Sequence, residues 1–293
     1  MMGSVALGAL TGSTGMRHAA RQAGLGLVLL LAACSEREVP PASVSAPPTP
    51  AAATQAGSSV PAPRTVDYEA ALSAPGRLAE DLAADEGRKP AEVLAFFGIQ
   101  PGMTVLDLFS GGGYYTELLS TIVGPTGRVV AHNNSPYLNG AAEELSKRFA
   151  DPQRLGNVER LAAENNALDL APGRFDFVLL SNVYHDVYFA NEARGWAKID
   201  GPMLLAELFA AMKPGAKVGV IDHAAPPGSP AETGGTLHRI DPAVVERDFE
   251  AAGFVLETQS DALRNSADDF SKNVFDPAVQ GRTDRFILRF RRP

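Results

Sequence analysis

Residues 104–120 read TVLDLFSGGGYYTELLS. The segment starts with an apolar, β-branched run that contains Asp107, continues with glycines at 111–113, and ends in a helix-compatible stretch. Glycine is required in such a turn because the backbone must adopt positive φ or come within contact distance of a ligand. A strand, a tight turn and a helix start, in this order, are typical of nucleotide-cofactor folds. The segment therefore predicts a ligand at the C-terminal end of a strand.

Strand and helix patterns alternate on both sides of this segment. Helical patterns precede it in residues 68–87 and 90–97; after it, we expect strands at 128–132, 158–162, 175–181 and 217–221 and helices at 115–123, 140–149, 203–212 and 241–252. Strands separated by helices indicate a parallel sheet that is covered on both faces. The chain ends with two strand-like runs, 254–259 and 285–291, and no convincing long helix between them. This ending predicts a terminal antiparallel pair.

With this order of elements the chain resembles the class I S-adenosylmethionine-dependent methyltransferases, and more narrowly the predicted methyltransferases of bacterial lipoprotein type. The resemblance extends from about residue 90 to the C-terminus. It implies an α/β, Rossmann-like fold with a seven-stranded, mostly parallel sheet whose last strand is antiparallel. It also implies S-adenosylmethionine as the cofactor, bound across the C-terminal ends of the first strands.

The glycine-rich loop carries the resemblance most directly. VLDLFSGGG matches the family's hydrophobic-acidic-x-Gly-x-Gly-x-Gly pattern with Asp107, Gly111 and Gly113 in register, and Ser110 lies within the loop. In the family the acidic residue orients the loop or the methionine amino group, and the later glycines admit the adenosyl moiety. Phe109 stands where the family has its first glycine, and this departure is compatible with the loop only if its side chain points into the core.

Two further positions correspond to cofactor contacts of the family. GRVVAHNNSP places Asn133 at the end of the second strand, where the family holds both ribose hydroxyls with an acidic residue. Asparagine lacks the charge-assisted bidentate contact of a carboxylate, so we expect a weaker grip on the cofactor. Glu164 and Asn165 follow the third strand, where the family accepts a hydrogen bond from the adenine amino group. A solvated loop start is the alternative interpretation of this pair.

FDFVLLSNVYHDVY, residues 175–188, matches the strand of the family that closes over the cofactor, and its end supplies Ser181 and Asn182 as cofactor contacts. His185 and Asp186 follow them. Imidazole titrates near neutrality and a nearby carboxylate can orient it, so this pair is the best candidate for a catalytic or substrate-contacting role. The alternative is a structural histidine, because adjacent residues on an extended chain point to opposite sides.

Asp222 and His223 end the next strand and should lie beside this pair, which makes His223 a further catalytic candidate. The same four residues, from His185 to His223, would also be compatible with a metal site. None of them has a paired helical spacing such as His-x-x-x-His, so we expect no metal there. The connection 260–284 is long for a hairpin, and it is expected either to cover the site as a lid or to be a surface feature.

The N-terminus predicts export and lipidation. The apolar run from Ala23 to Ala33 is too short to span a bilayer and is typical of a signal peptide. Leu31 to Cys34 resembles a bacterial lipobox, with Cys34 as the lipidated residue and the only cysteine in the chain. We therefore expect a signal peptide at 1–33, a disordered tether rich in Pro, Ala and Ser at 34–64, and a methyltransferase-like domain at 65–293. Translation starts either at Met1 or at Met16.

These observations predict a methyltransferase that acts on a small molecule at the cell envelope, on the periplasmic side. The net charge of −8 makes a nucleic-acid partner unexpected, and contact with the membrane is expected through the N-terminal lipid alone. The alternative is a catalytically weak or inactive ligand-binding lipoprotein, which Phe109, Asn133 and the export signal favour. A dinucleotide oxidoreductase ranks last, because Thr116 stands at the last glycine of GxGxxG. Nothing in the sequence specifies the oligomeric state.

Overall fold

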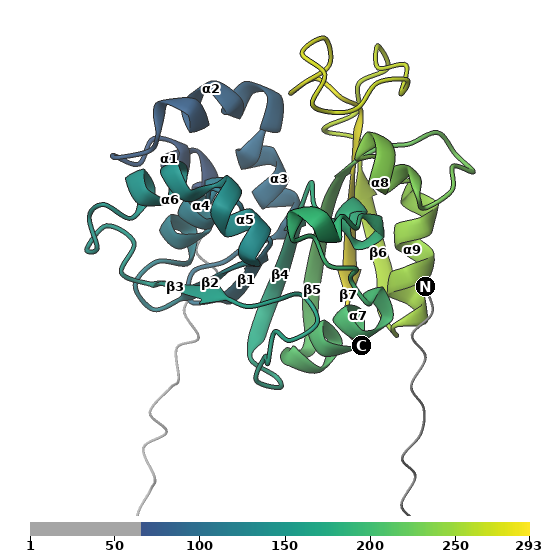
Figure 1. Cartoon of the computed structure of the whole chain (residues 1–293). Coiled ribbons are helices and arrows are strands. Elements are labelled where there is room, and N and C mark those ends of the chain that lie inside the picture. Colours follow the sequence, from purple (N-terminus) through teal and green to yellow (C-terminus); the bar gives the residue numbers. More distant parts are fainter. Residues whose placement is uncertain (1–65) are drawn as a thin grey trace, which may run out of the picture. The chain divides into compact units, whose positions relative to one another are not determined.

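The computed structural model describes residues 66–293, which form an α/β domain (Figure 1). The predicted signal peptide, the tether and Cys34 lie outside the described residues. Among the described helices, none is long and apolar enough to cross a membrane.

A single seven-stranded sheet organises the domain, with the order β3-β2-β1-β4-β5-β7-β6. The strands are β1 (Thr104–Leu108), β2 (Arg128–Asn133), β3 (Val158–Ala162), β4 (Phe175–Ser181), β5 (Met212–His223), β6 (Val255–Ser260) and β7 (Arg285–Arg291). Strands β1 to β5 pair in parallel, whereas β7 is antiparallel to both β5 and β6. The predicted fold class, with an antiparallel last strand, is confirmed.

Helices cover both faces of the sheet (Figure 1). They are α1 (Tyr68–Leu72), α2 (Ala79–Arg88), α3 (Pro90–Phe97), α4 (Tyr114–Val123), α5 (Ser135–Gly140), α6 (Ala142–Arg148), α7 (Gly201–Ala211), α8 (Thr233–Leu237) and α9 (Pro242–Ala251). Alternation along β1 feeds two cores: Val105 packs with the helices α3 and α4, and Leu106 packs with α7 and α9. Each face of the parallel sheet is therefore apolar, as the sequence predicts.

The predicted helix 140–149 is wrong in its bounds. Two short helices, α5 and α6, occupy this region and are separated at Ala141. The first helix begins earlier than predicted because Asn134 caps it by accepting a hydrogen bond from the amide of Tyr137, and Pro136 lies in its first turn. This early start places Tyr137 at the end of β2, next to the glycine loop.

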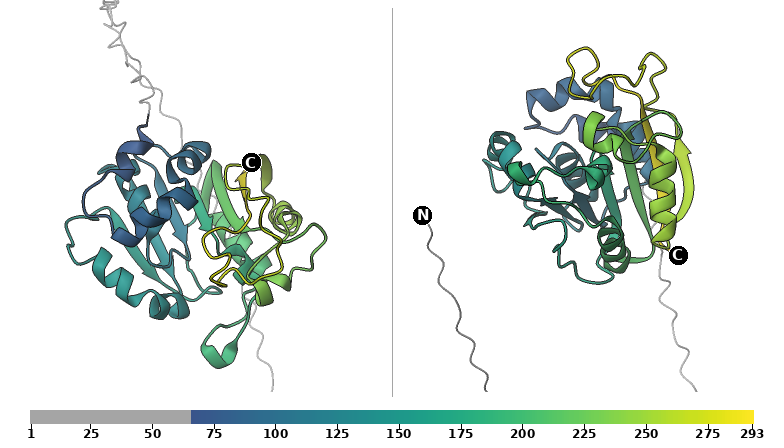
Figure 2. Two further views of the ribbon diagram at one scale, coloured as in Figure 1. Left: turned by 90° about the horizontal axis from the view of Figure 1, so that it is seen from above. Right: turned by 45° about the vertical axis from the view of Figure 1, so that its right-hand side comes forward.

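Several segments gather at the edge of the sheet where the parallel strands end. Figure 1 shows α2, α8 and the connection between β6 and β7 around this edge. A 3₁₀ helix, η1 (Tyr184–Tyr188), follows β4 there. The view from above in Figure 2 shows the same connection passing over this end of the sheet.

Candidate active site

The glycine loop is a strained turn between β1 and α4. Phe109, Gly111 and Gly113 have φ values of +55°, +56° and +86°, and the amide of Ser110 donates to the carbonyl of His132 at 2.8 Å. The Phe109 side chain is buried, with its ring 5.3 Å from that of His132 and 5.7 Å from that of Tyr137. Phe109 therefore packs in the core, so its replacement of the first family glycine leaves the loop intact.

Asp107 fixes the start of α4. Its carboxylate is buried and accepts a hydrogen bond from Thr116 Oγ1 at 2.6 Å. Burial raises the pKa of Asp107 to about 6, against the opposing effect of the Thr116 hydrogen bond. The carboxylate thus ties the strand before the loop to the helix after it.

Asn133 is hydrogen-bonded to the glycine loop. Its Oδ1 accepts from the Gly111 amide at 2.9 Å and its Nδ2 donates to the Gly111 carbonyl at 2.9 Å. The side chain is almost fully buried. Asn133 therefore holds the glycine loop in place, and the ribose contact implied by the family pattern is at most a second use of its oxygen.

The three glycines are required for different reasons. A Cβ at Gly112 would lie 1.7 Å from Oε2 of Glu144, and one at Gly113 would lie 2.9 Å from Cδ of Arg148, both on α6. A Cβ at Gly111 would meet no atom within 4 Å, so this glycine borders open space. Close packing of α6 thus explains two of the glycines, and Gly111 is the one that leaves room for a ligand.

A network of buried charged side chains holds the glycine loop in place. Sequence patterns did not indicate this network. Arg148 Nε donates to the carbonyl of Gly112 at 2.5 Å, and the same guanidinium forms ion pairs with Glu117 and Asp81. Arg154 also pairs with Glu117. No local motif marks these residues, since they come from α2, α4 and α6 and the segment after α6.

The pair after β3 is divided between two roles. Glu164 accepts hydrogen bonds from the amide and hydroxyl groups of Ser135, at the start of α5. Asn165 is 7% exposed, and its Oδ1 has no hydrogen-bond partner. Of the two, only Asn165 is buried with an unpartnered side-chain oxygen.

Unpartnered polar atoms are concentrated at this edge of the sheet. Among the described residues, nine buried side-chain nitrogen or oxygen atoms lack a hydrogen-bond partner, and five of these belong to Ser110, Asn165, Ser181, Asn182 and Asp186. Four of these residues are predicted cofactor contacts, and Asp186 is a predicted catalytic residue. A buried polar group without a partner costs about 1–3 kcal/mol, so this concentration indicates a ligand that satisfies them.

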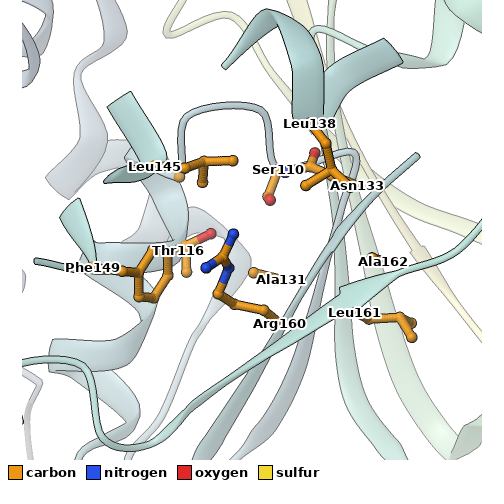
Figure 3. A pocket seen from close by; sticks show the side chains of 11 residues that line it. Ser110, Thr116, Ala131, Asn133, Leu138, Leu145, Phe149, Arg160, Leu161 and Ala162 are labelled. Atoms are coloured by element: carbon orange, nitrogen blue, oxygen red, sulfur yellow. The ribbon is translucent and has the colours of Figure 1, made fainter. Parts of the chain in front are cut away.

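A cleft of about 1130 Å³ opens at the same edge. Its walls come from α2, the glycine loop, η1, α8 and the connection 261–284, and they include Gly111, Tyr137, Ser181, Asn182, His185, Asp186, His223, His238, Phe275 and Arg285. The connection between β6 and β7 therefore borders the cleft, in the position expected of a lid. A smaller pocket of about 160 Å³ lies behind the loop, where Arg160 extends from β3 between Thr116 and Ala131 (Figure 3).

His185 is held between two carboxylates. Its Nδ1 donates to Asp222 Oδ1 at 2.7 Å, its amide donates to Asp222 Oδ2 at 2.9 Å, and its Nε2 lies 3.4 Å from Asp186 Oδ1. Burial lowers the pKa of His185, but the two carboxylates outweigh burial and the net shift is upward. The expected neighbourhood of the β4 and β5 ends is thus observed. Because His185 and Asp186 lie in a 3₁₀ turn, both border the cleft.

His223 differs from its neighbour. Its Nδ1 lies 2.7 Å from Thr283 Oγ1, and its ring centroid is 6.0 Å from that of His185. Burial, followed by repulsion from His185 and the nearby Arg285, holds the pKa of His223 well below its usual value. His223 is therefore a neutral side chain in the cleft wall.

Two residues that were not predicted complete this part of the cleft. Tyr137 donates its hydroxyl hydrogen to Asp186 Oδ2 at 2.6 Å, and His238 Nδ1 lies 3.5 Å from Asp186 Oδ1. Burial would raise the pKa of Asp186, but His238, His185 and Tyr137 together lower it. His238 follows a glycine- and proline-rich segment, and a Cβ at Gly234 in that segment would lie 2.4 Å from the carbonyl oxygen of His185.

Comparisons with known proteins agree with this geometry. The family model of protein-L-isoaspartate (D-aspartate) O-methyltransferase matches residues 63–162. The chain is 32% identical over 130 residues to the ubiquinone/menaquinone biosynthesis C-methyltransferase of Klebsiella pneumoniae and 31% identical to that of Shewanella halifaxensis. Each match covers 44% of this chain and 46% of the relative, so the chain spans about half the length of these relatives.

A solved structure extends the likeness to most of the fold. An S-adenosylmethionine-dependent methyltransferase from Aquifex aeolicus superposes with a TM-score of 0.50 and 24% identity, covering 78% of this chain and all of that one. The described domain therefore has the fold of these methyltransferases. Both sequence matches are to methyltransferases.

Proposed function

We propose that the protein is an S-adenosylmethionine-dependent methyltransferase that acts on a small molecule at the cell envelope. The observation that carries the proposal is the set of unpartnered buried polar atoms around a glycine loop at the ends of β1, β3 and β4. Ser110, Gly111, Asn165, Ser181 and Asn182 would hold the cofactor. When bound, the cofactor supplies an electrophilic methyl group on its sulfonium, and the protein supplies positioning and exclusion of water.

The methyl acceptor would occupy the part of the cleft next to His185, Asp186 and His223. Small-molecule pockets usually measure about 300–1,000 Å³, so the cleft of about 1130 Å³ has room for a cofactor and a small acceptor together. The connection 261–284 borders the acceptor side, so it is placed to shield the reacting groups from water.

Calorimetric titration of the purified chain with S-adenosylmethionine tests the cofactor assignment. Saturable binding is expected, and no heat at millimolar ligand would contradict the proposal. Binding without methyl transfer to any acceptor in a small-molecule panel would instead favour the ligand-binding alternative.

Ser181→Ala makes this test specific to the site. The Ser181 hydroxyl has no protein partner, so its removal breaks no protein hydrogen bond, and a fall in cofactor affinity would report a lost ligand contact. Ser120→Ala is the matched control, because Ser120 Oγ donates to Asn157 Oδ1 at 2.5 Å and does not border the cleft. It should lower stability and leave cofactor affinity unchanged.

For the location, the proposal rests on the lipobox-like residues Leu31 to Cys34, which lie outside the described residues. Lipidation of Cys34 would anchor the domain on the periplasmic side of the outer membrane. Fractionation of cells that express the wild type or Cys34→Ser tests this: the wild type should sediment with outer membranes, and the variant should not. An identical distribution of the two proteins would contradict the anchor.

A further inference from the structure

We propose that His185, Asp186 and His238 bind a divalent transition-metal ion on the acceptor side of the cleft. One ligand atom from each residue is available, and the three atoms all lie within 4.8 Å of one another. Two histidines and one carboxylate, with a position left open, form a donor set typical of catalytic zinc and non-haem iron sites. The proposed function does not require this ion.

The two distances from Asp186 to the histidine nitrogens fit a metal site better than they fit hydrogen bonds. Asp186 Oδ1 lies 3.4 Å from His185 Nε2 and 3.5 Å from His238 Nδ1, and it makes no hydrogen bond in the described structure. Hydrogen bonds between nitrogen and oxygen usually measure about 2.7–3.2 Å. Tetrahedral ligands at metal distances of about 2.0–2.1 Å are separated from one another by about 3.3 Å.

The residues around the three ligands are arranged as in a metal centre. The other ring nitrogen of His185, Nδ1, donates a hydrogen bond to Asp222 Oδ1 at 2.7 Å. This hydrogen bond orients Nε2 toward Asp186. The second oxygen of Asp186, Oδ2, accepts a hydrogen bond from the Tyr137 hydroxyl at 2.6 Å. This leaves Oδ1 as the oxygen that can bind a metal ion. Metal-binding histidines and carboxylates are regularly held by such hydrogen bonds.

The position of His238 is costly for the fold. It adopts φ of +52° at the end of α8, a conformation that residues other than glycine rarely adopt. Its ring lies between those of Phe189 and Phe275, with centroid distances of 5.4 and 4.9 Å, and 5.2 Å from that of His185. These aromatic contacts hold the His238 ring beside that of His185.

An ion at this place would leave its remaining coordination positions toward the cleft, because all three ligands border it. An oxygen or nitrogen atom of the methyl acceptor could occupy such a position. The ion would then orient the acceptor and lower the pKa of a bound hydroxyl group. The acceptor class implied is a small molecule with a metal-binding oxygen or nitrogen atom.

Titration with Zn²⁺ tests the site. The full chain is purified without a histidine tag and dialysed against a chelator before the titration. The wild type should bind one equivalent, and Co²⁺ in its place should give the intense visible absorption of a four- or five-coordinate ion. Asp186→Asn and His238→Asn should abolish saturable binding; asparagine is chosen at 238 because it tolerates positive φ. Asp222→Asn should weaken binding by about 10- to 100-fold, as an orienting residue does.

His223→Asn is the matched control, because His223 borders the same cleft but is outside the proposed ligand set. It should retain one equivalent of Zn²⁺. The proposal is overturned if the wild type shows no saturable binding, if binding survives both ligand substitutions, or if His223→Asn loses it. Affinity for S-adenosylmethionine, measured on every variant, reports folding. A chain that binds the cofactor but no Zn²⁺ refutes the ion alone, and one that binds Zn²⁺ but no cofactor refutes the methyltransferase proposal alone.

Discussion

Asn133 and Gly111 form a reciprocal pair in which the side-chain amide of one residue both accepts from and donates to the backbone of the other, each at 2.9 Å. An amide can do this because it carries a donor and an acceptor on one planar group, whereas a carboxylate carries only acceptors. Asn133 stands where the family pattern has an acidic residue, and it is the side chain that joins the glycine loop to the end of β2.

Asn133→Asp should weaken the binding of S-adenosylmethionine even though it restores the acid of the family pattern. The new oxygen would face the Gly111 carbonyl at 2.9 Å, so one hydrogen bond becomes a repulsive contact. Loss of a buried hydrogen bond costs about 1–3 kcal/mol, which predicts a loss of affinity of about 5- to 150-fold in calorimetric titration and a lower melting temperature.

The neighbouring residue offers a control for this substitution. Asn134→Asp is also buried, but its side chain only accepts a hydrogen bond, from the Tyr137 amide at 3.0 Å. Asparagine and aspartate cap helices about equally well, so this variant should be close to the wild type. Tighter cofactor binding by Asn133→Asp would show that the carboxylate reaches the ribose and that the pairing with Gly111 is dispensable.

Asp107→Asn should stabilise the domain at neutral pH. Because folding raises the pKa of Asp107 to about 6, the folded state holds a proton that the unfolded state has released between about pH 4 and 6. This group therefore lowers stability as the pH rises through that range, by up to about 3 kcal/mol. Asparagine keeps an acceptor for Thr116 and has no charge to bury.

Urea denaturation at pH 7 measures the effect of this substitution. Asp176→Asn is the control, because that carboxylate accepts from the Thr104 amide at 2.8 Å and pairs with Lys213 near the surface. It should be neutral or slightly destabilising. A lower stability of Asp107→Asn at pH 7 would mean that the carboxylate is better compensated than its burial indicates.

His132 should make the domain sensitive to acid. The ring is fully buried, Nε2 donates to the Ala163 carbonyl at 2.9 Å, and burial lowers the pKa of His132 to about 4. In the unfolded chain His132 takes up a proton near pH 6.5, whereas in the folded chain it stays neutral down to about pH 4. The contribution of His132 to the free energy of unfolding is therefore complete above pH 6.5 and is lost as the pH falls toward 4. The shift corresponds to about 3 kcal/mol.

Denaturation curves at pH 7 and pH 5 for the wild type and His132→Gln isolate this contribution. Glutamine also has a donor for the Ala163 carbonyl but does not titrate, so the difference in stability between the two pH values should be smaller in the variant. An unchanged difference would assign the acid sensitivity to other groups. The wild type must be compared with the variant because Asp107 has the opposite effect: its protonation raises stability as the pH falls over part of the same range.

The fold was predictable because its signals are local. Periods of two and 3.6 residues, with glycine and proline at the boundaries, gave the bounds of β3, β4, β7 and α3 as they are observed. The predicted helix 140–149 corresponds to α6, whereas α5 was missed because its start depends on the cap at Asn134 rather than on hydrophobic period. Parallel strand ends also predicted, correctly, that His185 and Asp222 meet.

The rest of the site depends on tertiary packing, which a single sequence does not display. His238 lies about fifty residues after His185 in the sequence, and the two rings are neighbours. They meet because Gly234 of α8 packs closely against the backbone of η1. The role of Asn133 depended on which backbone group lies opposite its amide. Both are decided by distances between segments rather than by the type or spacing of residues.

The connection 261–284 is expected to depend on one buried ion pair for its order. Arg239 and Asp268 have fully buried side chains and form two hydrogen bonds of 2.8 and 3.1 Å, and Asp268 also accepts from the Asp284 amide at 2.6 Å. Asp268→Ala leaves the guanidinium uncompensated, which typically costs about 3–5 kcal/mol. We expect faster proteolysis within the connection and a large fall in methyl transfer, with S-adenosylmethionine affinity little changed.

The same segment contains the control. Lys272 and Asp276 form a partly exposed ion pair at 3.9 Å, and such pairs contribute about 0–1 kcal/mol, so Asp276→Ala should match the wild type in proteolysis and turnover. Limited proteolysis with mass spectrometry locates the cleavage sites, and calorimetry measures cofactor affinity on the same samples. Unchanged turnover in an Asp268→Ala protein whose connection is cleaved rapidly would show that an ordered connection is not needed for transfer, and would make 261–284 a surface feature rather than a lid.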